Sequence, residues 1–566
     1  MATLPVHDRA IEPVEPVRIP STPALGRRGA VVAPHHLATA AGLRILAAGG
    51  HAVDAAIATN AVLAVVTPNG CGIGGDGFWL VWDEAAGEQS ALNGSGRAPA
   101  AASAAALRER GLTRLPLRGP LGISTPGAVR SWADAHRRWG RLSLSDVLAP
   151  AIELAADGFP AWDGLRRAVE QTAMSLGDAP WAAGFHAIWR PHGRPWEPGE
   201  VIRLPALSAT LLRIADDGFD TLYDGDLGAR QASFLAGIGA PFAAADFAGH
   251  HSDWTTPIAT TYRGTRVTTH PPNSCGIVAL EILNLLETFD PPAPDAWGPD
   301  GWADPRWIHL GIEASKLALA DRDAHVCDPS TREVPVEVLL DKEHARDLAR
   351  RIQEDRADRA PTPCRTLVGG TIFLATVDAE GNAVSLIQSN AAGFGSGVVD
   401  PETGIHYQNR GSSFSLEAGH PNELAGGKRT THSLLPGMLF RDGERSPWIV
   451  VGSMGGDIQP QIHAQFVSAV VDGGADVATG VSAPRWLVEP EGHFARPTYV
   501  GLESRIATDA AEGLRARGHD VHVRPAFDGA FGHEHAIELV RGGPAKPDGS
   551  LAAATDPRSA GLPAVR

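Results

Sequence analysis

The fold is decided by the stretch Gly369-Gly-Thr-Ile-Phe-Leu-Ala-Thr-Val-Asp-Ala-Glu-Gly-Asn-Ala-Val-Ser-Leu-Ile-Gln-Ser-Asn390. Its two apolar runs, 371–377 and 383–390, predict β-strands, and the polar residues 378–382 between them predict a turn. Together they predict an antiparallel hairpin that starts directly after a Gly-Gly pair.

The register of this hairpin places specific side chains together. If Asp378 pairs with Ala383, then Thr371 lies opposite Asn390, and an error of one residue brings Ser389 there instead. Opposed residues in an antiparallel ladder have Cβ atoms about 4.5–5.5 Å apart. Three small polar side chains are therefore expected to meet at the first residue of the strand.

The chain before this strand has the character of a cleavable linker. A charged helix is predicted over 342–357, and the polar, Pro-containing stretch 356–365 that follows is typical of exposed chain. A cut between Gly370 and Thr371 would give Thr371 an α-amine, which can act as the base for its own hydroxyl. Gly370 has no Cβ to hinder that reaction. The alternative is an ordinary strand-starting threonine.

A second segment offers hydrogen-bond donors for an oxyanion. Residues 447–451 predict a strand, and a helix is expected from about Ile458, with Asp457 as its N-cap and Pro460 in the first turn. The backbone N–H groups of Gly455 and Gly456 then lie at a helix N-terminus, where anions bind. A plain strand-to-helix turn is the alternative.

Composition excludes several classes of protein. The 566 residues are 43% hydrophobic and 20% charged, with a formal net charge of −16, which argues against nucleic-acid and anionic-membrane partners. No secretory signal or membrane-spanning stretch is found, so a cytoplasmic location is predicted. The cysteines have no metal-binding spacing and are expected to be free thiols: Cys71, Cys275, Cys327 and Cys364.

The N-terminal part contains two predicted helices, 36–50 and 53–66, a glycine loop at 70–77 and a strand at 78–82. In a dinucleotide site the glycines follow a strand and open a helix, which is the reverse of this order. No cofactor is therefore predicted. No metal is predicted either, because the paired histidines, including His533 and His535, lack HExxH spacing.

These motifs occur in an order that resembles the γ-glutamyltranspeptidase family of N-terminal-nucleophile hydrolases, over about residues 30–560. Besides the hairpin, the matching segments are 38–77, Ser124–Gly127, Pro150–Ile152, Ala155–Gly158, Tyr262–Gly264, Pro271-Pro272, Glu313–Lys316, Ala320–Arg322, Lys428-Arg429, Gly452–Gly456, Ala483–Arg485 and Asp556–Arg558.

The resemblance implies an α+β protein with a four-layer αββα fold, whose precursor cuts itself into two associated subunits. These would be 31–370 and 371–566, after a Pro-rich N-terminal segment, 1–30. It also implies Thr371 as nucleophile, Ser389 as its supporting hydroxyl, and Gly455 and Gly456 as the oxyanion donors. The resemblance leaves open whether the processed heterodimer forms a homo-oligomer. It also leaves open whether the acyl group is transferred to water or to an amine.

The sequence departs from the family at the residues that hold substrate. Ser95 stands where the family has a carboxylate-binding arginine, and Arg97 lies two residues further on. The positions that hold an α-amino group carry Arg410 and Ser413, the paired serines become His432 and Ser433, and the family's asparagine is matched only by Asn390, offset by one.

An arginine repels an α-ammonium and pairs well with a carboxylate. The pattern is similar to the oxamate amidohydrolase and glutaryl-type acylase subgroup, which implies a small acidic amide without a free α-amine. The alternatives are a γ-glutamyl enzyme with rearranged contacts, an inactive relative that serves as a binding or structural protein, and a nucleotide-dependent enzyme, which the glycine loop disfavours.

Overall fold

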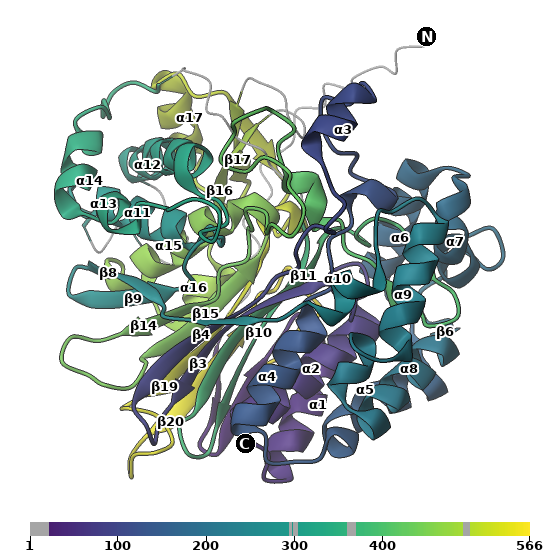
Figure 1. Cartoon of the computed structure of the whole chain (residues 1–566). Coiled ribbons are helices and arrows are strands. Elements are labelled where there is room, and N and C mark those ends of the chain that lie inside the picture. Colours follow the sequence, from purple (N-terminus) through teal and green to yellow (C-terminus); the bar gives the residue numbers. More distant parts are fainter. Residues whose placement is uncertain (1–21, 294–296, 298–303, 359–368, 491–497) are drawn as a thin grey trace.

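Two seven-stranded β-sheets lie face to face in the computed structural model of the chain, which describes residues 22–293, 297, 304–358, 369–490 and 498–566 (Figure 1). The first sheet has the strand order β1-β20-β19-β15-β14-β9-β8, and the second β21-β2-β10-β11-β3-β4-β7. The strands of these sheets are β1 Ala24–Gly26, β2 Gly29–Val32, β3 Asp76–Asp83, β4 Glu88–Gly94, β7 Asp253–Thr255, β8 Ile258–Tyr262, β9 Thr265–Thr269, β10 Gly369–Asp378, β11 Ala383–Ala392, β14 Gly437–Phe440, β15 Ile449–Met454, β19 His533–Val540, β20 Ser550–Thr555 and β21 Ala564–Val565.

Short strands form three smaller sheets, and helices cover the outer faces of the large ones. The short strands are β5 Phe159–Pro160, β6 Val201–Ile202, β12 Val399–Asp400, β13 Ile405–His406, β16 Trp486–Pro490, β17 Thr498–Glu503 and β18 Val521–Arg524. The α-helices are α1 His36–Ala47, α2 Ala52–Val66, α3 Ala104–Glu109, α4 Ala128–Trp139, α5 Leu144–Asp157, α6 Asp163–Leu176, α7 Ala183–Trp189, α8 Pro205–Asp217, α9 Asp226–Gly237, α10 Ala244–Ala248, α11 Gly276–Leu286, α12 Pro305–His325, α13 Val336–Leu339, α14 Lys342–Ala349, α15 Gln459–Val471, α16 Val477–Ser482 and α17 Thr508–Ala516. The 3₁₀ turns used below are η5 Arg410–Ser413 and η6 Gly456–Ile458.

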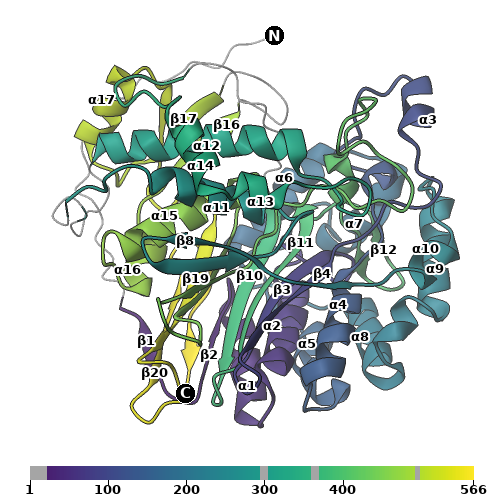
Figure 2. The same ribbon diagram turned by 60° about the vertical axis from the view of Figure 1, so that its left-hand side comes forward.

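Four layers result, in the order helices, sheet, sheet, helices, so the predicted αββα fold is confirmed (Figure 2). Alternation along β10 explains this, because successive side chains of a strand point to opposite faces. Phe373 and Ala375 enter the apolar core between the sheets, whereas Ile372 and Leu374 pack against the layer that contains α1, α2 and α5.

The hairpin of β10 and β11 is anchored on α2. A carboxylate oxygen of Asp378 accepts the Ala52 N–H, and the Thr376 hydroxyl donates to the Ala52 carbonyl. The other carboxylate oxygen of Asp378 accepts the Glu380 and Asn382 N–H groups within the turn. The first residue of the proposed small subunit is thus fixed by a hairpin tied to a buried helix.

The predicted register is wrong by one residue. Asp378 ends β10 and closes the turn, where its N–H donates to the Asn382 carbonyl, so Val377 is the residue that pairs with Ala383, and Thr371 lies opposite Ser389 instead of Asn390. This is the one-residue offset that the sequence left open.

Each large sheet combines strands from both sides of position 370. In the second sheet β2, β3, β4 and β7 come from the N-terminal side, and β10, β11 and β21 from the C-terminal side. The predicted N-terminal segment also contributes, because β1 joins the first sheet at β20, and β2 begins at Gly29. The two proposed subunits are therefore interlaced parts of one folded body.

Two local predictions differ from the structure. The helix expected over 342–357 is α14, which ends at Ala349. Asp457 does not cap α15, because that helix has Ile458 at its N-cap and no side-chain cap, while Pro460 lies in its first turn as predicted. Asp457 instead pairs with Arg322 of α12, at 3.5 Å.

Three of the four cysteines, Cys71, Cys275 and Cys327, are buried free thiols, as predicted, and Cys364 lies outside the described residues. Within the described ranges, every helix is too short or too polar to cross a bilayer.

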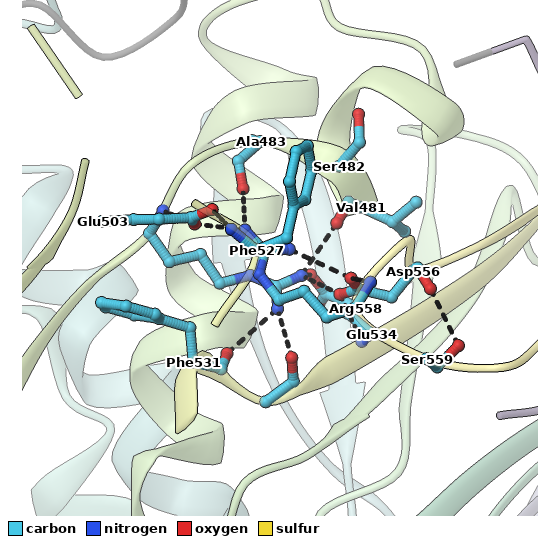
Figure 3. A network of polar contacts seen from close by, with 12 residues as sticks. Val481, Ser482, Ala483, Glu503, Phe527, Phe531, Glu534, Asp556, Arg558 and Ser559 are labelled. Carbon is cyan, nitrogen blue, oxygen red and sulfur yellow. Dashed lines mark hydrogen bonds and ion pairs between the residues drawn. The ribbon is translucent and has the colours of Figure 1, made fainter. Parts of the chain in front are cut away.

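A buried ion-pair network joins the end of β20 to the segments that precede β16 and β19 (Figure 3). Asp556 forms ion pairs with Arg485 at 2.7 Å and with Arg558 at 3.0 Å, and all three side chains are almost completely buried. Arg485 also donates to the carbonyls of Phe531 and Gly532. A Cβ at Gly532 would lie 2.2 Å from the Met454 carbonyl oxygen, so this contact fixes the end of β15.

Asp556→Asn is expected to lower the free energy of unfolding by about 3–5 kcal/mol, because it removes the carboxylate that two buried guanidinium groups share and leaves Arg485 with Glu534 and Arg558 with Glu503. The urea midpoint at pH 7 measures this, with the exposed Asp520→Asn as control. Burial alone would raise the pKa of Asp556, but Arg485 and Arg558 hold that pKa well below its usual range.

The stabilisation by Asp556 is accordingly present above the unfolded-state pKa of about 3.9 and is lost as the pH falls below it. The difference between the wild type and Asp556→Asn should shrink between pH 6 and pH 3. Equal urea midpoints at pH 7 would show that the network does not stabilise the fold.

Candidate active site

A β-bulge lies at the predicted cleavage site. Gly370 pairs with Ala391 and Thr371 with Ser389, so Asn390 is an extra residue between the two pairs. Bulges re-aim side chains at functional sites. Ala391 has a left-handed backbone, with φ of 74°, which costs free energy for a non-glycine residue. The ladder is therefore irregular where the chain is expected to be cut.

Gly370 is required by close packing against neighbouring backbone. A Cβ at this position would lie 2.3 Å from the Asn69 carbonyl oxygen and 2.7 Å from that of Ala392. No other residue fits without a shift of the backbone.

A chain of hydrogen bonds joins the predicted nucleophile to the bond before it. The Thr371 and Ser389 hydroxyl oxygens are 2.9 Å apart, and the Ser389 hydroxyl lies 2.9 Å from the Gly370 carbonyl oxygen, to which it can donate. The Ala391 N–H donates to the Ser389 oxygen and fixes it. Thr371 is 2% exposed, so these groups interact in an environment of low dielectric.

Arg410, in η5, extends these hydrogen bonds. Its Nη2 donates to the Ser389 oxygen and its Nη1 to the Ser433 oxygen, both at 3.3 Å. The side chain is 2% exposed, and its Nε has no hydrogen-bond partner within the described segments. Burial lowers the pKa of Arg410, which Asp76 and Asp457 partly offset. A buried guanidinium with donors to spare, two hydrogen bonds from the nucleophile, is suited to bind an anion.

Asp76 is a site residue that sequence reasoning did not single out. It pairs with Ser389 across β3 and β11, so Thr371, Ser389 and Asp76 form one row on the face toward the other sheet. Gln408 and the Gly96 N–H donate to one of its oxygens. Burial raises the pKa of Asp76 to about 7, against the opposing effect of Arg410. A lone acid in the glycine loop, at the start of a buried strand, was the available signal.

His432 lies beside this acid. Its Nδ1 accepts the Leu434 N–H, so its Nε2 carries the proton and donates to Asp76 at 3.1 Å. Burial, followed by the nearby Arg410, keeps the pKa of His432 well below its usual value, so the ring is neutral. The histidine therefore orients Asp76 without adding charge.

The predicted oxyanion donors lie in the turn between β15 and α15. β15 packs against β10 across the inter-sheet core, and η6, which begins at Gly456, also contacts β10. Gly456 has a left-handed φ of 62°, which favours glycine there. The backbone N–H groups of Gly455 and Gly456 are thereby held near the strand that carries the predicted nucleophile.

The other predicted substrate residues are more dispersed. Arg97 donates to the His251 carbonyl and pairs with Asp253 at 3.2 Å, so its guanidinium is already engaged. Ser413 ends η5, and its carbonyl accepts a hydrogen bond from the Asn422 amide. Asn390 lies beside the glycine loop, and its amide donates to the carbonyl of Pro68, just before that loop.

Arg429 is a second residue whose position the sequence did not reveal. Its Nε donates to the Ser95 carbonyl, and it shares Asp253 with Arg97. The Arg429 guanidinium thus lies beside Ser95, the position at which the resemblance implies a carboxylate-binding arginine.

Comparison with known proteins gives consistent matches over nearly the whole chain. The family model described as gamma-glutamyltranspeptidase matches residues 38–565. The chain is 38% identical over 543 residues to an oxamate amidohydrolase proenzyme of Klebsiella pneumoniae, which covers 95% of this chain and 98% of the relative. It is 37% identical over 540 residues to a glutathione hydrolase-like YwrD proenzyme of Bacillus subtilis, with the same two coverages.

Among solved structures, a cephalosporin acylase from Bacillus halodurans superposes with a TM-score of 0.87 and 36% identity, over 99% of both chains. The similarity therefore includes both large sheets and the helical layers outside them.

Proposed function

Because the chain belongs to the γ-glutamyltranspeptidase family of enzymes, we propose that it is a self-processing amide hydrolase with Thr371 as its nucleophile. The observation that carries this proposal is the run of hydrogen bonds from the Thr371 hydroxyl through Ser389 to the Gly370 carbonyl, at the β-bulge. A catalytically inactive scaffold has no need for this arrangement.

In self-processing, the Thr371 hydroxyl oxygen adds to the Gly370 carbonyl carbon. Ser389 donates to the carbonyl oxygen and so stabilises the negative charge that develops there. Collapse breaks the peptide bond, and the hydroxyl proton ends on the nitrogen, which leaves an ester between Gly370 and Thr371. Water hydrolyses this ester and releases a carboxyl group on Gly370 and a free α-amine on Thr371.

The free α-amine then serves catalysis. With a pKa of about 7.7–8.0, it is partly neutral near pH 7 and can take the proton from the Thr371 hydroxyl. The hydroxyl oxygen attacks the substrate amide, and the Gly455 and Gly456 N–H groups stabilise the oxyanion. The amine passes the proton to the leaving nitrogen, and water hydrolyses the acyl-enzyme ester.

Arg410 determines the class of amide in this proposal. A substrate carboxylate at its guanidinium lies within two hydrogen bonds of the Thr371 hydroxyl, which leaves room for only a short spacer between carboxylate and scissile amide. We therefore propose a small half-amide of a dicarboxylic acid, with oxamate as the shortest member. The 38% identity to an oxamate amidohydrolase proenzyme supports the same class.

A panel of amides tests this proposal. Oxamate, succinamate and glutaramate should be hydrolysed with higher kcat/KM than glutathione or a γ-glutamyl anilide, by about 100-fold for the best of them, because like charges in contact cost several kcal/mol. Glutathione as the best substrate would contradict the role given to Arg410. No release of ammonia or amine from any of these compounds would contradict the whole class.

A further inference from the structure

Three side chains of types that bind metals lie together outside the candidate active site, in the helical layer of α11, α12 and α14, whose arrangement Figures 1 and 2 show. Glu281 comes from the middle of α11, Asp321 from α12 and His344 from α14. Each of them offers one ligand atom, and these atoms all lie within 4.8 Å of one another. The three residues are distant in sequence, which is why no spacing pattern revealed them.

Glu281 gives the cluster its significance. Its side chain is 3% exposed, and neither of its carboxylate oxygens has a hydrogen-bond partner among the residues that the structure describes. Burying an unpaired carboxylate costs several kcal/mol, so buried charges are normally paired or bound to a metal. Burial, followed by the nearby carboxylate of Asp321, raises the pKa of Glu281 well above its usual value.

The other two residues of the cluster contact each other and do not offset the cost of burying the Glu281 carboxylate. His344 Nε2 lies 3.1 Å from an Asp321 oxygen, so these two side chains contact each other. Lys342, at the start of α14, is engaged with Glu287 and Asn284 near the end of α11. The cluster thus has two carboxylates and one imidazole, and the described part of the chain places no paired cation at Glu281.

We propose that Glu281, Asp321 and His344 bind one divalent transition-metal ion, for which Zn²⁺ is the best probe. Zinc takes imidazole and carboxylate ligands at about 2.0–2.2 Å, so two ligand atoms on one ion lie at most about 4.4 Å apart. Small side-chain rotations reach this from the observed separation. The two carboxylates balance the charge of the ion, and water fills the remaining position.

The ion links three helices of the outer layer. α12 also carries Arg322, whose guanidinium pairs with Asp457 in the turn that follows β15. The site is structural in this assignment, and it stabilises the helices that lie behind the proposed oxyanion turn. Its existence does not depend on the proposed hydrolase activity.

A second cluster, His309, Glu313 and His519, provides a comparison. Its two histidines are hydrogen-bonded to each other at 2.7 Å, and Glu313 accepts from Lys316 and from the Asp358 N–H. Because these groups are already satisfied and a lysine adds positive charge, we expect no metal there.

Untagged full-length protein, treated with EDTA and dialysed, tests the assignment by calorimetric titration with Zn²⁺. We expect one ion per chain at this site and a rise in Tm of roughly 3–5 °C at saturation. Glu281→Gln and His344→Gln should each weaken binding by more than about 100-fold and remove the rise in Tm, since each loses a direct ligand.

Two variants serve as controls. Glu343→Gln changes an exposed neighbour of His344, and His519→Gln changes the second cluster. Both should bind Zn²⁺ as the wild type does. Co²⁺ adds a spectroscopic readout, because its visible absorption should be lost in Glu281→Gln.

Unchanged Zn²⁺ stoichiometry and affinity in both Glu281→Gln and His344→Gln would overturn the proposal. Failure of the wild type to bind Zn²⁺ would overturn it as well. If a ligand variant does not fold, the titration of the other and the Tm shift of the wild type decide.

Discussion

Thr371→Ala is expected to remain a single chain of 59.3 kDa and to lose all measurable amidase activity, a decrease of about 10⁴-fold or more. The variant lacks the hydroxyl that both cuts the precursor and attacks the substrate. Alanine keeps the Cβ and the strand geometry, so the Tm should change little. Denaturing gel electrophoresis and the best substrate of the amide panel measure the two effects.

Thr371→Ser is the matched control, because it retains both the hydroxyl and, after cleavage, the α-amine. We expect it to be processed and active, at a reduced rate. Processing of Thr371→Ala at position 370 would show that the hydroxyl of this residue is not the group that cuts the chain. Normal activity of an unprocessed variant would exclude the α-amine as the base.

Arg410→Met is expected to lower kcat/KM for a half-amide with a free carboxylate by about 10²–10³-fold, and to leave neutral amides of the same length nearly unaffected. This loss corresponds to about 3–4 kcal/mol, the range for a desolvated charge pair that loses one partner. The Tm should stay the same or rise, because removing a buried guanidinium without a directly paired carboxylate relieves desolvation.

Arg97→Met distinguishes between the two arginines that the sequence suggested. The guanidinium of Arg97 is engaged with Asp253 and the His251 carbonyl, so we expect an effect below about tenfold and no preference for acidic over neutral amides. Arg410 also contacts Ser389, so its substitution can reduce self-processing as well as substrate binding. The activity of each variant is therefore expressed per processed molecule. A larger acidic-substrate defect in Arg97→Met than in Arg410→Met would reverse the assignment.

Local sequence was sufficient for the hairpin and for the partners within it. Two apolar runs predicted β10 and β11, and the short turn between them brought Thr371 to Ser389 within one residue. The exact pairing depended on Asp378, whose side chain accepts two N–H groups of the turn, so that the pairing of β10 with β11 ends at Val377. The bulge at Asn390 depended in part on contacts with the Asn69–Gly70 backbone, which lies far away in sequence.

Contacts between distant segments could not be predicted in this way. The Asp76–His432 pair joins residues 356 apart, and its formation requires β3 and the segment before β14 to meet between two sheets. Likewise, Arg410 was expected to bind substrate, but its hydrogen bonds to Ser389 and Ser433 depend on how η5 packs. The sequence indicated which types of residue form the site. Which of them lie beside the predicted nucleophile depends on tertiary packing.

The central claim, that the chain cuts itself before Thr371, is tested most directly by the intact mass of freshly purified wild-type protein under denaturing conditions. The account predicts two species, which correspond to residues 1–370 and 371–566, with Thr371 at the N-terminus of the smaller one. A single full-length species of 59.3 kDa that persists after long incubation would contradict it.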